Sequence, residues 1–276
     1  MDFDRLFTIS AFEGLRLLRN LIATVPAVKP EDCPSALLGY APEASSYDLD
    51  AAMQLHSMVA VDAPHDTVAF YRECVLAVLL VKMPAFAKLM TLGRGRFIKR
   101  IKGDEYRDIR SVFREAKLLD PPTAEDIQWW DTILGRVRLN FDQERLALAR
   151  AAESLSLEYE RSELRKLGIA EEPIWMALED NTVGYDVLSH RLAEGGSTKN
   201  LLVEVKSTIA SPLRFIVSRN EWDVADQVGA SYLFHVWDMT KTPPAHYIRT
   251  VEQVRPHVPV DNQKGKWKTA QIPLGI

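Results

Sequence analysis

The chain has few cysteines and no long hydrophobic run. Cys33 and Cys74 are the only two cysteines among its 276 residues, and neither belongs to a Cys-x-x-Cys or Cys/His cluster. The sequence therefore contains no disulfide framework, and its cysteine spacing argues against a zinc site. The longest apolar run, around residues 74–81, is too short to cross a bilayer. We accordingly expect no membrane partner.

Two further signals are absent, a secretory leader and a basic overall charge. Residues 1–4 provide neither the basic start nor the apolar core of a signal peptide, so we expect a cytoplasmic protein. The formal net charge of −4 differs from the basic balance of proteins that coat nucleic acid. Because the metal site of a hydrolase is itself acidic, this charge is compatible with a nuclease whose nucleic-acid contacts are local or shared with a partner.

The composition is that of a globular protein, and the apolar spacing suggests two domains. Hydrophobic residues make up 47% and charged residues 26% of the chain. Helical spacing predicts a mostly helical domain over residues 1–140, with a role in targeting or assembly. A second domain is expected over residues 141–276. The helices expected in the first domain cover residues 4–25, 66–83, 107–119 and 124–139.

Residues 183–208 show the pattern of a β-hairpin. Val183–Ser189 and Leu201–Thr208 are rich in residues that favour strands. The Gly-Gly-Ser segment at residues 195–197 predicts a turn between them. The spacing fits two strands joined by a modest loop.

The hairpin carries one aspartate on its first strand and a Glu-x-Lys triplet on its second. Successive side chains of a strand point to opposite faces, so Glu204 and Lys206 share one face. The hairpin can set Asp186 beside Glu204 across the ladder. Two carboxylates can hold a hard cation, and one ammonium can stabilise or deprotonate an attacking water. The pattern therefore predicts a hydrolytic Mg²⁺ site.

The Glu-x-Lys triplet by itself has little specificity. A second copy, Glu115–Lys117, falls in a predicted helix, where residues i and i+2 do not face each other. A bare triplet in a strand is also compatible with a solvated polar face. The partner Asp186 and the flanking elements are what favour a site at residues 204–206.

The hairpin is flanked by helices and further strands. Ser218 and Glu221 form a capping box that starts a helix, and Gly229 ends that helix. From residue 141 the predicted order is helix, strand, strand, strand, helix, strand. The remaining elements of this order are a helix over residues 141–167 and strands over residues 174–178 and 232–237.

Four short motifs of the C-terminal half together indicate a family. They are Leu157–Glu160, Gly184–Ser189, Val203–Thr208 and Ser218–Trp222. Through them, residues 152–237 resemble the NO VEIN-type C-terminal domain, which belongs to the PD-(D/E)xK nuclease-like superfamily. The resemblance implies an α+β fold with an α/β core. In that fold, the helical N-terminal domain is followed by a PD-(D/E)xK-like αβββαβ core of the restriction-endonuclease type.

The resemblance implies a catalytic role for each matched residue of the hairpin. Asp186 and Glu204 would ligate Mg²⁺ or Mn²⁺, and Lys206 would orient or activate the water and stabilise charge on the phosphate. Two nearby carboxylates would hold Lys206 in its charged form. This favours an electrostatic role for Lys206 over a role as a free base.

A glutamate on the preceding helix usually completes the acidic cluster of this superfamily. The register of the family pattern selects Glu153 as the third metal ligand, with Glu158 and Glu160 as alternatives. The family commonly has a Gly-Glu pair where this chain has Ala152-Glu153. The charge is retained, although the start of the helix can differ.

Contacts with nucleic acid are expected at two places. Asn220 matches the family and is a candidate polar contact near the site, whereas Glu221 is interpreted mainly as a cap. A basic cluster interleaved with Gly and Phe can contact phosphates, and a solvated basic loop before the next helix is the alternative interpretation. This cluster consists of Arg94, Arg96, Lys99, Arg100 and Lys102.

These features together predict a metal-dependent endonuclease that hydrolyses phosphodiester bonds, with DNA as the expected substrate and RNA as the alternative. The family resemblance implies a setting in bacterial restriction or antiphage defence. A partner ATPase, a helicase or another defence subunit is a candidate partner, and so is a second copy of the chain. The competing hypothesis is a catalytically silent nucleic-acid-binding or scaffold module in a defence complex. The presence of both acids and the lysine favours the enzyme.

Overall fold

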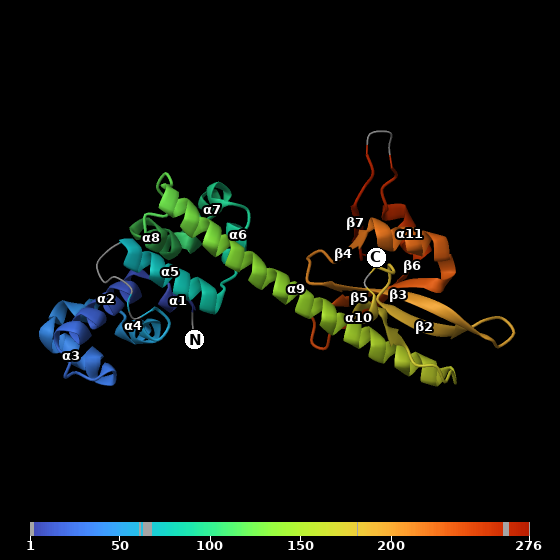
Figure 1. Ribbon diagram of the computed structural model, residues 1–276, viewed down its shortest axis with the longest axis horizontal. Helices are drawn as coiled ribbons and strands as arrows, with labels where there is room; N and C mark the ends of the chain where they lie inside the picture. Colours follow the sequence, from blue (N-terminus) through green and yellow to red (C-terminus); the bar gives the residue numbers. More distant parts are fainter. Residues whose placement is uncertain (1–2, 61, 63–67, 181, 262–264, 276) are drawn as a thin grey trace. The chain divides into compact units, whose positions relative to one another are not determined.

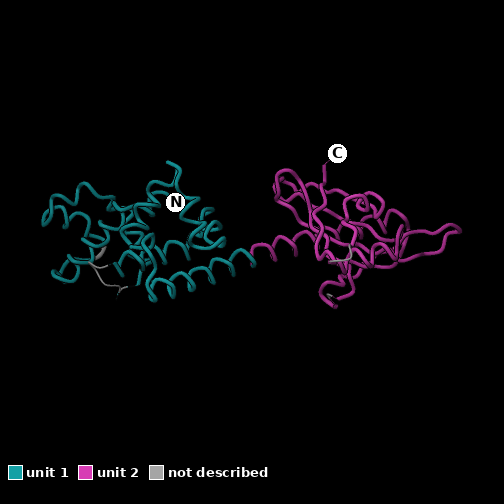
Figure 2. Tube along the Cα trace, turned by 90° about the horizontal axis from the view of Figure 1, so that it is seen from above, with its two compact units in different colours: residues 1–142 teal, residues 143–276 magenta. Residues whose placement is uncertain are grey.

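The computed structural model divides the chain into two units, Met1–Asp142 and Gln143–Ile276 (Figure 2). It describes residues 3–60, 62, 68–180, 182–261 and 265–275. Unit 1 is helical, and unit 2 combines helices with strands (Figure 1). The expected α+β class and the helical N-terminal part are therefore confirmed.

Unit 1 consists of short helices around an aromatic core. Thr8 splits the helix expected over residues 4–25, because its hydroxyl accepts the N–H of Ala11 and caps a new helix. In the core, the rings of Phe97 and Trp130 lie 5.7 Å apart. The helices that precede the long helix of the chain are α1 (Phe3–Leu6), α2 (Ile9–Thr24), α3 (Cys33–Tyr40), α4 (Leu49–His56), α5 (Val68–Lys82), α6 (Ala87–Met90), α7 (Arg94–Arg100) and α8 (Arg107–Glu115).

Two of these helices correspond to expected ones with different ends. Helix α5 matches the helix expected over residues 66–83, of which residues 66 and 67 lie outside the described residues. Helix α8 ends at Glu115, although helix was expected as far as residue 119. Lys117 adopts a positive φ of 53°, which is incompatible with a continuing right-handed helix.

Helix α9 (Ala124–Lys166) is continuous where two helices were expected, over residues 124–139 and 141–167. The residue at the expected break, Asn140, is neither the glycine nor the proline that commonly stops a helix. Gly168, with a φ of 68°, follows its last turn. The part up to residue 142 belongs to unit 1 and the rest to unit 2 (Figure 2).

The main sheet of unit 2 has the strand order β1-β2-β3-β5-β6. Strand β3 pairs in parallel with β5, and the other neighbours in this sheet are antiparallel. Strands β4 and β7 form a second, two-stranded sheet. The strands are β1 (Ile174–Trp175), β2 (Val187–Leu192), β3 (Thr198–Thr208), β4 (Arg214–Ser218), β5 (Tyr232–Asp238), β6 (Ala245–Thr250) and β7 (Thr269–Pro273), and the helices among them are α10 (Met176–Glu179), α11 (Arg219–Val228) and α12 (Val251–Val254).

This order differs from the expected helix, strand, strand, strand, helix, strand. The strand expected over residues 174–178 is only the two-residue β1, and α10 follows it directly. Strand β2 begins at Val187, because Gly184 adopts a φ of 82° that lies outside the strand region. Strands β4, β6 and β7 were not expected. All six residues of β6 are half-buried, so it lacks the alternation of apolar and polar residues that signals a strand.

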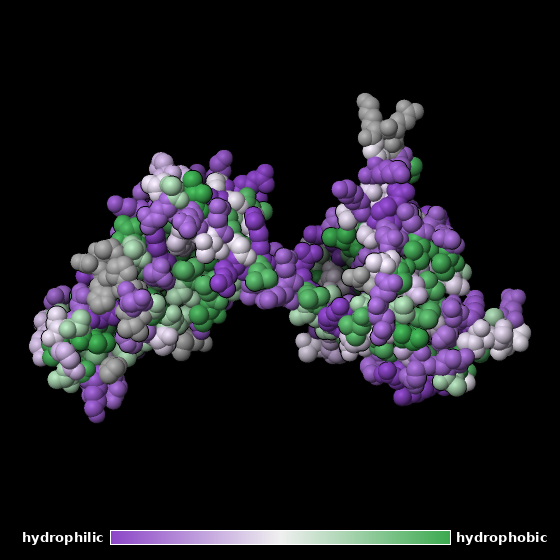
Figure 3. Space-filling model, viewed as in Figure 1, coloured by the Kyte–Doolittle hydropathy of each residue, from purple (hydrophilic) through white to green (hydrophobic). Residues whose placement is uncertain are grey.

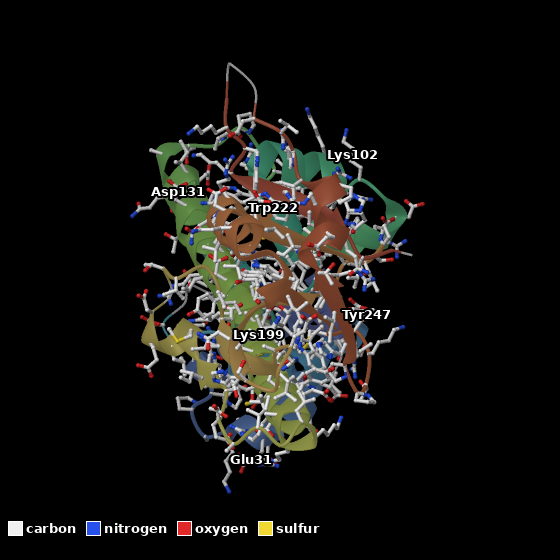
Figure 4. The ribbon with its side chains drawn as sticks, turned by 90° about the vertical axis from the view of Figure 1, so that its right-hand side faces the viewer. Glu31, Lys102, Asp131, Lys199, Trp222 and Tyr247 are labelled. Carbon is white, nitrogen blue, oxygen red and sulfur yellow. The ribbon has the colours of Figure 1, made fainter. Side chains whose placement is uncertain are left out.

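Strand β3 has two different faces. On one face, Val203 and Val205 pack against α9. On the other, Glu204 lies beside its register partner Phe234 of β5, which packs against α11 and β4. Trp222 of α11, labelled in Figure 4, belongs to this covering layer. The expected separation of the glutamate from the two valines is therefore confirmed.

Candidate functional site

The hairpin of β2 and β3 positions Asp186 immediately before β2. The register pairs Val187 with Val203, which brings Asp186 opposite Glu204. The Asp186 N–H donates to the carbonyl of Val203 at 2.9 Å, and Asp186 Oδ2 accepts the N–H of Val205 at 2.7 Å. The backbone of β3 thus fixes the Asp186 carboxylate beside Glu204, as the hairpin pattern predicted.

Lys206 lies between two carboxylates. Its Nζ is 2.6 Å from Oε1 of Glu204 and 2.9 Å from Oε2 of Glu221. Burial opposes the charge of Lys206, but the attraction of Glu204 and Glu221 outweighs it and raises the pKa of the ammonium. Lys206 is therefore held as a cation, as expected, although its second partner is Glu221 rather than Asp186. We call Asp186, Glu204, Lys206 and Glu221 the β3 cluster.

Glu221 has two functions in the fold. It occupies the third position of α11 and completes the capping box, since its Oε2 accepts the N–H of Ser218 at 2.8 Å. The same carboxylate pairs with Lys206. Burial opposes ionisation of Glu221, but Lys206 and the Ser218 hydrogen bonds lower its pKa. The sequence indicated the cap but not the ion pair, because the crossing of α11 over β3 creates that contact.

The remaining two carboxylates of the β3 cluster are poorly compensated. Burial is the main cause that raises the pKa of Asp186 to about 6, and the charges of Glu153 and Glu221 add to it. Glu204 is 4% exposed, and burial together with the charge of Asp186 raises its pKa well above the ordinary value. The single ammonium of Lys206 opposes both shifts. The cluster thus holds more acids than cations, and an added cation would relieve this imbalance.

Tyr232 fixes the loop before Asp186 by a hydrogen bond. Its buried hydroxyl donates to the carbonyl of Gly184 at 2.6 Å and lies 3.5 Å from Oε2 of Glu204. A Cβ on Gly184 would lie 2.7 Å from Cγ2 of Val224, so this position requires glycine for space as well as for its positive φ. Nothing in the sequence pattern singled out Tyr232.

Glu153 is buried near the β3 cluster but has its own partners. Its Oε2 accepts hydrogen bonds from Arg150 Nη1 at 2.7 Å and from the indole N–H of Trp175 at 2.6 Å. Among the described residues, no three or more His, Cys, Asp or Glu side chains are grouped so as to hold a metal ion. The predicted three-acid set is therefore not assembled. Asp186 and Glu204 form the oxygen-donor pair that fits Mg²⁺ or Mn²⁺.

The two alternatives to Glu153 lie elsewhere. The side chain of Glu158 is 70% exposed and pairs with Arg161. Glu160 is fully buried, and its two oxygens accept from Arg191 at 2.7 and 3.0 Å. Oε1 of Glu160 is also 3.4 Å from Nε2 of His235. We call Glu160, Arg191, His235 and the neighbouring His246 the α9 cluster, since it lies between α9 and the sheet.

The candidate nucleic-acid contacts belong to both units. Asn220 of unit 2 is exposed, and its side chain donates to the carbonyl of Thr182 at 3.4 Å. Arg94 of unit 1 is half-buried and donates to the carbonyls of Leu118, Leu119 and Asp120. Arg94 therefore fixes the chain after α8. The other predicted contacts of this cluster, Arg96, Lys99 and Arg100, are exposed.

Comparison with known proteins identifies the C-terminal domain. No curated protein and no solved structure matches the chain. Among the described residues, no helix is long and apolar enough to cross a membrane. The family model described as Protein NO VEIN, C-terminal, matches residues 152–248, which include all four residues of the β3 cluster. Residues 152–248 of unit 2 are therefore similar to the NO VEIN-type C-terminal domain.

Proposed function

We propose that unit 2 is a Mg²⁺- or Mn²⁺-dependent endonuclease that hydrolyses phosphodiester bonds of DNA. The observation that carries this proposal is the meeting of Asp186, Glu204 and Lys206 at one end of a hairpin, with both acids left poorly compensated. Hydrolysis of a phosphodiester requires a nucleophilic water and compensation for the charge that develops on the phosphate. Oxygen ligands can hold a metal ion that activates the water, and a fixed cation can compensate the charge on the phosphate.

The roles of the residues follow from their surroundings. Asp186 and Glu204 would hold the metal ion, which when bound would acidify a water and offset charge on the phosphate. Lys206 is kept as an ammonium by Glu204 and Glu221, so it would stabilise negative charge rather than accept a proton. Glu221 is a positioning residue, because it orients Lys206 and fixes the start of α11.

The connectivity of unit 2 adds support for a PD-(D/E)xK-like core. Helix α9, the strands β1, β2 and β3, helix α11 and strand β5 occur in this sequence along the chain, with α10 inserted after β1 and β4 inserted before α11. Asp186 immediately precedes β2, and the Glu-x-Lys triplet lies on β3, close to the positions that the superfamily resemblance implies. A role in restriction or antiphage defence, with a partner ATPase or helicase, is part of the same proposal.

A cleavage assay tests the nuclease. Wild type, Glu204→Gln and Asp186→Asn would be incubated with plasmid, linear duplex, single-stranded DNA and RNA, in Mg²⁺, Mn²⁺ or EDTA. We expect metal-dependent cutting of DNA that falls by about a thousand-fold or more in both variants. Glu158→Gln, an exposed isosteric change on α9, is the matched control and should cut like the wild type. Cutting that is insensitive to Glu204→Gln and Asp186→Asn would contradict the assignment.

The ion pairs of Lys206 favour one alternative, a catalytically silent scaffold or nucleic-acid-binding module. Lys206 pairs with both Glu204 and Glu221, so the cluster has internal partners of its own. A silent module would bind nucleic acid and cut no substrate under any metal condition. In that case the isosteric variants would also leave DNA affinity unchanged.

A further inference from the structure

A stretch of unit 1 contains positive charge without negative charge. Between Glu73 and Asp104 the chain has seven Lys and Arg residues and no Asp or Glu. The whole chain has a net charge of −4, so this is a local concentration rather than a general property. A local concentration of positive charge attracts anions.

The structure uses only some of these cations internally. Within the stretch, Arg94 donates to backbone carbonyls after α8. Outside it, Arg110 of α8 donates to the carbonyls of Ile101 and Gly103 that follow α7. Both guanidinium groups thereby donate to backbone carbonyls that follow a helix and lack a partner within it. These two arginines are structural.

Four other cations lie on α7 and the loop after it. Each is exposed, and none has a hydrogen bond or an ion pair within the described part of the chain. Phe97, on the buried side of α7, packs against Phe113 and Trp130, which fixes the helix on the core. Figure 3 shows hydrophilic residues over α7, and Lys102 lies at the periphery of the ribbon in Figure 4. The four residues are Arg96, Lys99, Arg100 and Lys102, which we call the α7 patch.

Many cations of unit 2, in contrast, pair with carboxylates. Arg161, Lys166 and Arg219 each lie 2.7–2.8 Å from a carboxylate oxygen, at Glu172, Glu163 and Asp261 respectively. Arg255 likewise pairs with Asp226. The cations of the α7 patch therefore differ from these four basic residues of unit 2, each of which pairs with a carboxylate.

We propose that the α7 patch binds the phosphodiester backbone of DNA. This proposal rests on the proposed nuclease function and assigns substrate capture to unit 1. Phosphates are bound by long cationic side chains without an apolar anchor, and such contacts carry no sequence information. Phe97 and Ile101 are fully buried, so the patch offers charge rather than the aromatic anchors of a protein interface. This chemistry favours DNA backbone over an acidic protein segment.

The test measures binding separately from cutting. The Glu204→Gln chain would be titrated against a fluorescent duplex DNA in EDTA at several salt concentrations, with the α7 patch intact or changed to glutamine at all four positions. Each lost phosphate contact reduces the slope of log affinity against log salt by about 0.9. We expect the fourfold change to reduce this slope by about 3 and to weaken binding at least about ten-fold at low salt.

The control is Arg136→Gln with Arg138→Gln, which removes two exposed cations of α9 in the same unit and should change affinity less than about two-fold. Melting curves verify folding, and Arg100→Glu alone serves as a milder variant. An unchanged slope and affinity after the fourfold change would overturn the proposal, as would preference for RNA or polyglutamate over DNA. DNA binding through the patch by a protein that never cuts would support it while refuting the nuclease.

Discussion

The sheet of unit 2 has a buried polar cluster on each side, and the two balance their charges differently. The β3 cluster has three acids around Lys206. The α9 cluster pairs one acid, Glu160, with Arg191, and its histidines stay neutral because burial lowers their pKa values. The balanced α9 cluster resembles a structural ion pair, whereas an excess of acid destabilises the fold. We infer that the excess is retained for binding a cation.

The largest effect on stability is expected where the β3 cluster loses its cation. Lys206→Met would leave Glu204 and Glu221 buried without their partner. Removing one member of a buried pair costs about 3–5 kcal/mol of unfolding free energy. Urea denaturation measures this loss. A loss near zero would mean that Lys206 does not balance the acids.

A somewhat smaller loss is expected on the other side of the sheet. Glu160→Gln keeps the shape but removes the charge that pairs with Arg191, whose side chain is 24% exposed and can regain water. We expect a loss of about 2–3 kcal/mol in the same urea experiment. DNA cutting by the folded variant should be unchanged. A variant that folds normally but fails to cut would show that the α9 cluster takes part in function.

Removing the charge of an acid in the β3 cluster should have the opposite effect and raise the free energy of unfolding. Asp186→Asn removes a poorly compensated charge and keeps an oxygen for the Val205 N–H, so it should stabilise the fold by about 1 kcal/mol at pH 8. The folded pKa of about 6 lies above the unfolded value. Folded wild type therefore takes up a proton as the pH falls through 6, and the advantage of the variant should disappear by pH 5. Destabilisation by Asp186→Asn at pH 8 would contradict the excess of acid.

The smallest effect on stability is expected from replacing a histidine of the α9 cluster. Burial lowers the pKa of His246 to about 4, although Glu160 opposes the shift, and the rings of Tyr159 and His235 pack against the imidazole. Below pH 6.5 the unfolded chain takes up a proton that the folded chain refuses, so stability falls between pH 6.5 and 4. His246→Gln should reduce this loss by about 1 kcal/mol. Equal losses in both proteins would exclude His246 as a cause.

The sequence was most informative where local geometry decides the outcome. The period of two in a strand places Glu204 opposite Val203 and Val205, and the Ser218 capping box starts α11 where expected. The hairpin spacing also brought Asp186 to its position beside β3. These features depend on neighbours in the chain or across one turn.

Contacts between distant elements were not visible in the sequence. The pair of Lys206 and Glu221 depends on how α11 crosses β3, and the Tyr232 hydroxyl reaches Gly184 from another strand. The continuity of α9 was missed because its polarity changes along the helix although no residue breaks it. Half-buried β6 had too little alternation to be recognised.

The most direct test of metal binding by the β3 cluster is a calorimetric titration with Mn²⁺ at pH 7.5. Wild type, Asp186→Asn and the exposed control Glu158→Gln would be compared. We expect wild type and Glu158→Gln to bind Mn²⁺ alike, and Asp186→Asn to lose this binding. Absence of Mn²⁺ binding by the wild type, or equal binding by Asp186→Asn, would contradict the claim that the acidic excess of the β3 cluster holds a metal ion.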